Sequence, residues 1–264
     1  MKISLRTIYI NVVRFVILAV LVFLWELASG GIYEDFELIS PLIIGRPSLI
    51  AEDFIRYVTS DLFIRDLSAT MQATIWGLII GIVSGVGLGI IFAYSKFVED
   101  TFRPFVVAIN TLPRPALAPL ITIWFGFGII SKILVSWSIV FFIIFFNTIQ
   151  GIKSIDPDLI KVVKVMGSGR MGIIRHIILP AIATWVFAAF RVSVSFALIG
   201  AVIGEFVGAH AGLGYRILVA SGLFETNRVF TVLIILMILG ICLVKFSEYV
   251  ENKVLKWKPP TAIY

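Results

Sequence analysis

Residues 133–151 read ILVSWSIVFFIIFFNTIQG, and this stretch indicates the class of fold. It contains no charged side chain, and its apolar residues do not follow the strict alternation of a half-buried strand. As an α-helix rising 1.5 Å per residue, it would cover about 28 Å, close to the hydrocarbon thickness of a bilayer. We therefore predict that it is a membrane-spanning helix.

The composition of the whole chain supports the same class. Of its 264 residues, 59% are hydrophobic and only 14% charged, and the mean hydropathy is +1.05. A soluble domain usually carries about a quarter charged residues. Lipid must therefore cover the excess apolar surface, which predicts an integral membrane protein. The net charge of +6 then reflects membrane topology rather than a nucleic-acid partner. The single cysteine, Cys242, lies in an apolar run and is expected to be a buried thiol, and no Cys/His cluster suggests a metal site.

Six segments are long and apolar enough to cross a bilayer, which predicts an all-α integral membrane protein with six transmembrane helices. The first of them lacks a clear small-residue cleavage site, so we expect a membrane span rather than a cleaved signal. The six predicted spans are Ile10–Ser29, Ser68–Tyr94, Pro104–Phe127, Ile133–Gly151, Ala181–Ile203 and Val229–Tyr249.

The distribution of Lys and Arg predicts the orientation of these spans. With six spans, the loops rich in basic residues all share one side, which the rule makes cytoplasmic. The longest loop on the other side has more acidic than basic residues. Both termini are therefore expected to be cytoplasmic. The basic residues on the cytoplasmic side are Lys2, Arg6, Arg14, Lys96, Arg103, Lys153, Lys161, Lys164, Arg170, Arg175, Lys253, Lys256 and Lys258.

The second span carries a glycine at every fourth position, at Gly77, Gly81, Gly85 and Gly89. Such a series makes a smooth groove on one helix face, where another helix can approach closely. Two interpretations remain open. The groove is either ordinary packing within the bundle or a site of contact or sliding between subunits.

The third span contains Pro113, Pro115 and Pro119 within seven residues. Each proline removes a backbone donor and clashes with the preceding turn, so we expect a broken or kinked helix. The irregular backbone would either line a watery cavity inside the protein or lie near the interface and re-aim the helix.

Polar residues inside the spans are the candidates for a translocation path. Arg191 lies in the middle of the fifth span, where an arginine needs a partner or water. We place Arg191, Ser193 and Ser195 on the path, together with Arg114 near the prolines; the alternative for Arg191 is a structural tie to a neighbouring helix. Glu205 is expected at the outer end of the fifth span, where its charge costs little.

The loop between the fourth and fifth spans is too structured for a simple connector. Asp156 followed by Pro157 is a helix-start signal, and Gly167 supplies a stop. Leu159, Val162, Val163 and Met166 recur at helical spacing between them, with Lys161 and Lys164 on another face. Ser168 could cap a second short helix that leads to Leu179-Pro180. We therefore expect two short helices at a fixed angle against the inner membrane surface.

The same loop resembles the EAA loop of ABC importer permeases. Gly167, Ile177, Leu179 and Pro180 reproduce its G-x9-I-x-L-P pattern in the loop where that family has it. The stretches Pro119–Gly128, Ser131-Lys132 and Gly212-Leu213-Gly214 are similar to permeases of the nitrate/taurine/sulfonate group. The resemblance covers roughly Pro41 to Pro259 and implies a type I ABC importer permease-like fold in the bacterial inner membrane.

This resemblance implies a function and partners. The loop would hold the coupling helix that seats on a separate ABC ATPase, and a homodimer would form the path for a small, often anionic solute delivered by an extracytoplasmic binding protein. The family's Glu-Ala-Ala is Lys161-Val162-Val163 here, so the charge at that contact is inverted. The residues expected to couple the chain to the ATPase are Asp156, Leu159, Lys161, Val162, Val163, Gly167, Ile177, Leu179 and Pro180.

The chain itself is expected to have no catalytic residues and no cofactor. It contains no G-x-x-x-x-G-K-[ST] phosphate loop, so ATP would be bound by the partner. An ion-gradient-driven secondary transporter is the main alternative, but no internal repeat or paired intramembrane carboxylates are evident. An intramembrane enzyme is disfavoured because His176 and His210 lie in loops on opposite sides. We divide the chain into an N-terminal helix and outer loop (1–65), a permease core (66–250, with the coupling loop at about 153–180) and a cytoplasmic tail (251–264).

Overall fold

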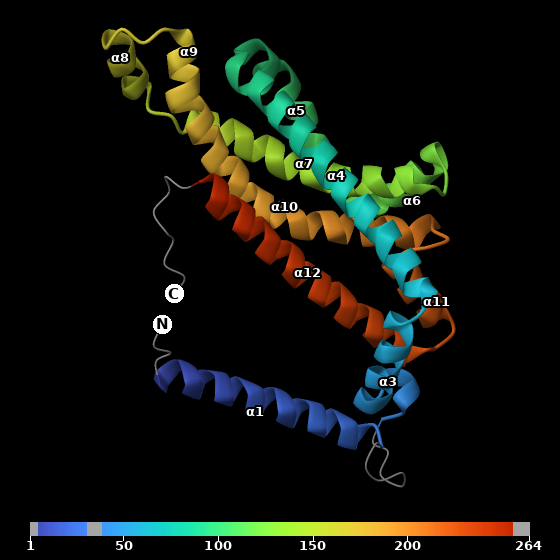
Figure 1. Cartoon of the computed structure of the whole chain (residues 1–264). Helices are drawn as coiled ribbons and strands as arrows, with labels where there is room; N and C mark the ends of the chain where they lie inside the picture. Colours follow the sequence, from blue (N-terminus) through green and yellow to red (C-terminus); the bar gives the residue numbers. More distant parts are fainter. Residues whose placement is uncertain (1–4, 31–38, 256–264) are drawn as a thin grey trace. The chain divides into compact units, whose positions relative to one another are not determined.

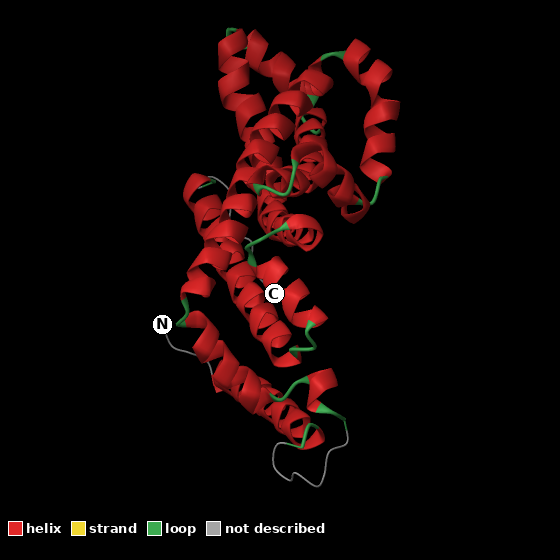
Figure 2. Cartoon of the chain, turned by 90° about the vertical axis from the view of Figure 1, so that its right-hand side faces the viewer, coloured by secondary structure: helices red, strands yellow, loops and turns green. Residues whose placement is uncertain are grey.

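The computed structural model describes residues 5–30 and 39–255, and these are helical apart from short turns and loops (Figure 1; Figure 2). In chain order the elements are α1 (Leu5–Ala28), α2 (Pro41–Ile44), α3 (Pro47–Val58), α4 (Asp61–Tyr94), α5 (Lys96–Thr111), α6 (Arg114–Phe125), α7 (Ile129–Lys153), α8 (Pro157–Val165), α9 (Arg170–Ile173), the π-helix η1 (Ile174–Ile178), α10 (Leu179–Gly208), α11 (Leu213–Gly222) and α12 (Thr226–Val254).

Within the described residues, five helices are long and apolar enough to cross a membrane. They are α1, α4, α7, the run of 38 residues Met171–Gly208 that ends in α10, and α12. A sixth crossing exists if α5 and α6 are counted as one span, and these two helices are bent by 97° at the break between them. The all-α fold is confirmed, but the predicted third span, Pro104–Phe127, is two helices rather than one.

The break between α5 and α6 follows from the prolines. Leu112 precedes Pro113 and is extended, with φ −64° and ψ 131°, because the proline ring disfavours helical backbone in the residue before it. The Arg114 guanidinium donates hydrogen bonds to the carbonyl oxygens of Ile109 and Asn110, 3.1 and 3.2 Å away, which lie in the last turn of α5. Arg114 therefore caps the helix that the prolines end. Pro119 lies inside α6 without ending it.

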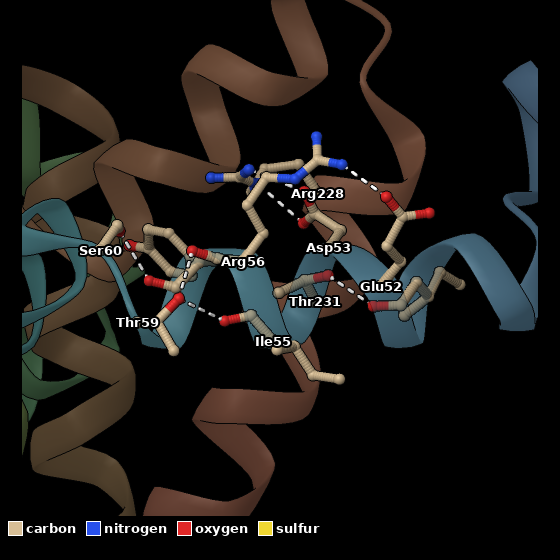
Figure 3. Close-up of polar contacts among 10 residues, drawn as sticks. Glu52, Asp53, Ile55, Arg56, Thr59, Ser60, Arg228 and Thr231 are labelled. Carbon is tan, nitrogen blue, oxygen red and sulfur yellow. Dashed lines mark hydrogen bonds and ion pairs between the residues drawn. The ribbon is translucent and has the colours of Figure 1, made fainter.

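The chain forms two compact units. The first comprises residues 1–65 and 216–236, in so far as they are described. In it, α3 buries Ile50 and Tyr57 and joins the beginning of α12 through Arg228, whose guanidinium donates two hydrogen bonds of 2.7 Å to the Asp53 carboxylate (Figure 3). The Arg228 guanidinium also lies 4.7 Å from the centre of the Tyr57 ring. These contacts fix α3 relative to the start of α12.

The second unit comprises residues 66–215 and 237–264, again in so far as they are described. Its centre is the packing of α7 on α10, where Val140, Ile144, Ala189 and Ala197 form a buried apolar cluster. Helix α6 packs against both. Large apolar side chains remain exposed along α1, α4, α10 and α12, as expected of helices that lipid covers.

Cys242 is one of the exposed residues of α12. The prediction that it is buried within the protein is wrong. An apolar run in a membrane helix places a side chain away from water, but that side chain can face lipid as well as protein.

Candidate functional site

The predicted pair of helices between the fourth and fifth spans, residues 156–180, is called the elbow here, and it begins as expected. Helix α8 starts at Pro157, and the Asp156 carboxylate accepts a hydrogen bond of 2.8 Å from the backbone N–H of Asp158. Gly167, which follows α8, has φ +83°, a conformation that side-chain-bearing residues rarely adopt. The predicted start and stop of this helix are confirmed (Figure 1).

A second helix begins at Arg170, shortly after Ser168, as predicted, but it does not end before the fifth span. Helices α9, η1 and α10 follow one another without a break. At the π turn, the N–H of Leu179 bonds to the carbonyl of Ile174, five residues earlier. Pro180 has no N–H, and in a regular helix its ring would clash with the carbonyl four residues before it. The wider turn lets the helix pass Pro180 instead of ending there. The elbow is therefore joined directly to the membrane-spanning helix α10.

The elbow presents apolar side chains at its surface. Leu159, Val162 and Leu179 are each more than half exposed. Val163 and Ile177 line a groove of about 450 Å³ together with Asp156 and Leu159. Lys161, which stands where the resembling family has glutamate, is exposed and forms an ion pair of 2.8 Å with Asp158, and Pro180 is half-buried at the start of α10. All nine predicted coupling residues thus lie in one elbow.

Arg191 lies in α10 and has acidic partners on α12. Its guanidinium nitrogens lie 2.9 Å from a Glu251 oxygen and 3.5 Å from a Glu248 oxygen. The Glu251 side chain is 9% exposed and that of Arg191 42%. These ion pairs favour the alternative of a structural tie between helices. A role in lining the path stays a prediction.

The other predicted path residues do not gather around Arg191. Ser193 is fully buried, and its hydroxyl has no hydrogen-bond partner in the described part of the chain. Ser195 lines a shallow groove against α12 with Lys245 and Glu248. Arg114 lies at the bend between α5 and α6, with its guanidinium 4.4 Å from the centre of the Phe142 ring. Arg114 caps the C-terminal end of α5. Its predicted role in lining the solute path stays a prediction.

The glycine face of α4 is occupied by α7 of the same chain. Gly77, Gly81, Gly85 and Gly89 are all buried. A Cβ added at Gly81 would lie 2.5 Å from Val140, and one at Gly89 would lie 2.7 Å from Thr148. Gly87, which lies off this face, has open space around it. The four glycines therefore let two helices of one subunit approach closely.

A buried polar cluster is the feature that sequence reasoning missed. Glu205, Thr70 and Asp66 are fully buried. The Glu205 carboxylate accepts hydrogen bonds from the Thr70 hydroxyl at 2.8 Å and from the N–H of Gly214 at 2.7 Å. Lys132 is 5% exposed and interacts electrostatically with Glu205. Glu205 lies in the last turn of α10, near the helix end where it was expected, but the expectation that its charge costs little there is wrong because the side chain is fully buried.

Side chains of this cluster accept hydrogen bonds from the backbone of the turn between α10 and α11. The N–H of Gly212 donates to Asp66 at 3.1 Å, and the N–H of Leu213 donates to the Thr70 oxygen at 2.8 Å. Gly212 has φ +130°, and a side chain there would collide with the Glu205 carboxylate. The Gly212-Leu213-Gly214 motif is therefore needed for close approach of backbone to carboxylate. Two glycines in a short turn, seven and nine residues after Glu205, were the signal that could have indicated the cluster.

Comparisons with known proteins agree with this architecture. Residues 85–256 match the family model for the binding-protein-dependent transport system inner membrane component. SsuC of Bacillus subtilis, named as an aliphatic sulfonates transport permease, is 30% identical over 91% of this chain and 85% of its own length. The riboflavin transport system permease RibX of Chloroflexus aurantiacus is 32% identical over 82% of this chain and 81% of its own length. The formylaminopyrimidine transport permease ThiX of Halalkalibacterium halodurans is 32% identical over 90% of this chain and 92% of its own length.

Solved structures share the fold at lower identity. A chain of a bacterial ABC transporter for alginate import superposes with a TM-score of 0.64 at 15% identity, over 94% of this chain and 96% of that one. A chain of the inward-facing MetNI methionine ABC transporter gives 0.60 at 17% identity, over 73% and 96%. The chain belongs to the binding-protein-dependent transport system inner membrane component family, and it is a multi-pass inner-membrane permease of an ABC importer.

Proposed function

We propose that this permease works as a homodimer driven by separate ATPase subunits, and that each ATPase seats against the elbow of residues 156–180. The observation that carries the proposal is the unbroken passage from α9 through η1 into α10. Force applied at the elbow would reach the membrane-spanning part of α10 without crossing a flexible joint. The exposed apolar side chains of Leu159 and Val162 are the contact surface that an ATPase would cover.

The same proposal includes an orientation and a cargo. The elbow and both termini lie in the cytoplasm, as the basic residues of the short loops predict. The cargo is a small solute, such as a sulfonate or a vitamin precursor, and an extracytoplasmic binding protein delivers it. The names of SsuC, RibX and ThiX support a small organic solute, and the family's name supports the binding protein.

Co-purification with an ATPase tests the coupling surface. The tagged chain is expressed with the ATPase and binding protein of its own operon, and retained ATPase is measured by quantitative mass spectrometry. Val162→Asp places a charge in the proposed apolar contact, and we expect at least a tenfold loss of ATPase, since burying an unpaired charge costs several kcal/mol. Thr59→Asp, at an exposed site outside the elbow, is the matched control and should retain the ATPase. Equal retention by both variants would refute this contact.

The angle of the elbow is tested by two glycines. Gly167 has a positive φ, whereas Gly169 does not, and both have open space around them. Gly167→Ala should therefore reduce ATPase retention and solute-stimulated ATP hydrolysis, while Gly169→Ala should not. Equal effects would mean that the angle at Gly167 is unimportant for coupling.

Orientation and energy source require separate measurements. Met166 is 79% exposed and is therefore a suitable position for a labelling cysteine. In a Cys242→Ser background, Met166→Cys should react with a membrane-impermeant maleimide only from the cytoplasmic side. Labelling from the exterior would contradict the orientation. Uphill solute uptake by proteoliposomes that contain the chain without any ATPase would instead favour a secondary transporter.

A further inference from the structure

A cavity of about 340 Å³ lies between four helices of the second unit, and it shares no lining residue with the elbow groove or the Glu205 cluster. Phe92 of α4, Arg103 of α5, Phe145 of α7 and Trp185 of α10 all contribute to its lining. Cavities that hold small ligands begin at about this size, and they combine apolar walls with a few polar groups. This cavity has both features.

The apolar wall of the cavity is held in place by ring contacts. Phe145 is 1% exposed, and its ring meets that of Phe92 edge-on, with centroids 4.9 Å apart, and that of Phe146 at 5.2 Å. Trp185 packs over Gly151, where an added Cβ would lie 3.1 Å from the Trp185 side chain. Aromatic pairs in such edge-to-face arrangements are favourable and restrict each other's rotation. The wall is therefore preformed rather than dependent on a ligand.

The polar rim of the cavity carries an excess of positive charge. Glu99 accepts from Lys153 at 2.5 Å and from Arg103 at 3.2 Å, so two cations share one carboxylate. The Glu99 side chain is 15% exposed, but those of Lys153 and Arg103 are 41% and 68% exposed. An arginine has five N–H donors and a lysine three, and Glu99 engages one donor of each.

The donors that remain on Arg103 and Lys153 can bind an oxyanion. An arginine fork matches the oxygen spacing of carboxylates and sulfonates, and a lysine adds a point charge. The rings below the rim would meet the apolar body of the same molecule. A fully solvated ion pair on a protein surface would lack such a wall.

We propose that this cavity is a binding site for a small organic anion, with its carboxylate or sulfonate group at Arg103 and Lys153 and its apolar part against Phe145 and Trp185. The proposal concerns binding to the permease chain itself. It does not depend on the ATPase contact at the elbow.

The test measures binding of two probes of matched shape to the full-length chain in detergent, by isothermal titration calorimetry. Benzenesulfonate carries the anionic group, and benzamide is a neutral molecule of similar size. Benzenesulfonate should bind saturably with one site per chain, and benzamide at least tenfold more weakly, because hydrogen bonds to charged groups contribute more than neutral ones. No saturable binding of benzenesulfonate, or equal affinity for both probes, would overturn the proposal.

Variants separate the site from general charge effects. Arg103→Gln and Lys153→Gln should each weaken benzenesulfonate binding by about tenfold. Lys96→Gln removes a positive charge from an exposed position of the same helix α5 outside the cavity, and it should leave the affinity unchanged. Trp185→Phe should preserve binding and Trp185→Ala should weaken it. If Lys96→Gln weakens binding as much as Arg103→Gln does, the effect is bulk electrostatics and the proposed site is wrong.

Discussion

The hydroxyl of Thr70 donates a 2.8 Å hydrogen bond to Glu205, joining α4 to α10 across 135 residues of chain. Both residues are fully buried. The second oxygen of Glu205 accepts from the N–H of Gly214, so one carboxylate ties two helices to the turn that begins α11. A carboxylate so enclosed contributes only while its partners are in place, because burial of an unsatisfied charge is costly.

Glu205→Ala should therefore destabilise the protein strongly. The substitution leaves the buried N–H of Gly214 without its acceptor and the buried Lys132 without its opposite charge, which costs about 2–4 kcal/mol. The measurement is the thermal unfolding midpoint of the purified chain in detergent. Glu225→Ala removes an exposed glutamate and should change the midpoint little. A Glu205→Ala protein as stable as the Glu225→Ala control would show that the cluster is unimportant for stability.

The glycine face of α4 allows a prediction with an internal control. Gly81→Ala places a Cβ 2.5 Å from Val140, so α4 and α7 must separate, and we expect a loss of about 1–3 kcal/mol. Gly87→Ala meets nothing within 4 Å and should be neutral or slightly stabilising, since alanine favours a helix over glycine. Thermal unfolding of both variants in the same detergent measures the difference. Equal midpoints would mean that α7 does not occupy this face.

A double-mutant cycle tests the tie between α10 and α12. Arg191→Gln and Glu251→Gln should each destabilise the protein, and the double variant should cost less than the sum of the two. We expect a coupling of about 1–3 kcal/mol, because Arg191 and Glu251 bond directly at 2.9 Å. Additive effects would indicate that Arg191 serves another purpose, such as lining the solute path. Uptake measured on the same variants would then show whether transport falls without loss of stability.

Arg228→Lys should weaken the first unit more than Arg56→Lys does. Arg228 makes two bonds to Asp53, and both side chains are at most 20% exposed (Figure 3). Lysine cannot reproduce the two parallel bonds, and we expect a loss of about 1–3 kcal/mol. Arg56 pairs with Glu52 at the surface, where both side chains are more than 60% exposed, so its replacement should cost no more than about 0.5 kcal/mol. The free energy of unfolding from denaturant titration provides the comparison, and the reverse order would contradict it.

Much of the architecture was readable from local sequence. The all-helical membrane fold, the start of α8 at Asp156-Pro157 and the stop at Gly167 depend on composition and on residues next to one another. The break in the third span was predicted as well, because the prolines act on the backbone beside them. The second helix of the elbow does begin after Ser168, but the sequence did not reveal that it continues through a π turn into α10.

The amino-acid sequence by itself determined which segments are helical, which are apolar enough for lipid to cover and where turns interrupt them, because these properties depend on near neighbours. Only the tertiary structure decided what the polar residues inside the membrane segments do. Arg191 meets Glu251, 60 residues away, and Glu205 is enclosed by partners from α4 and from the turn after α10. A buried charge is stable only with such partners, and the chain brings them together through helix packing, which no local pattern specifies.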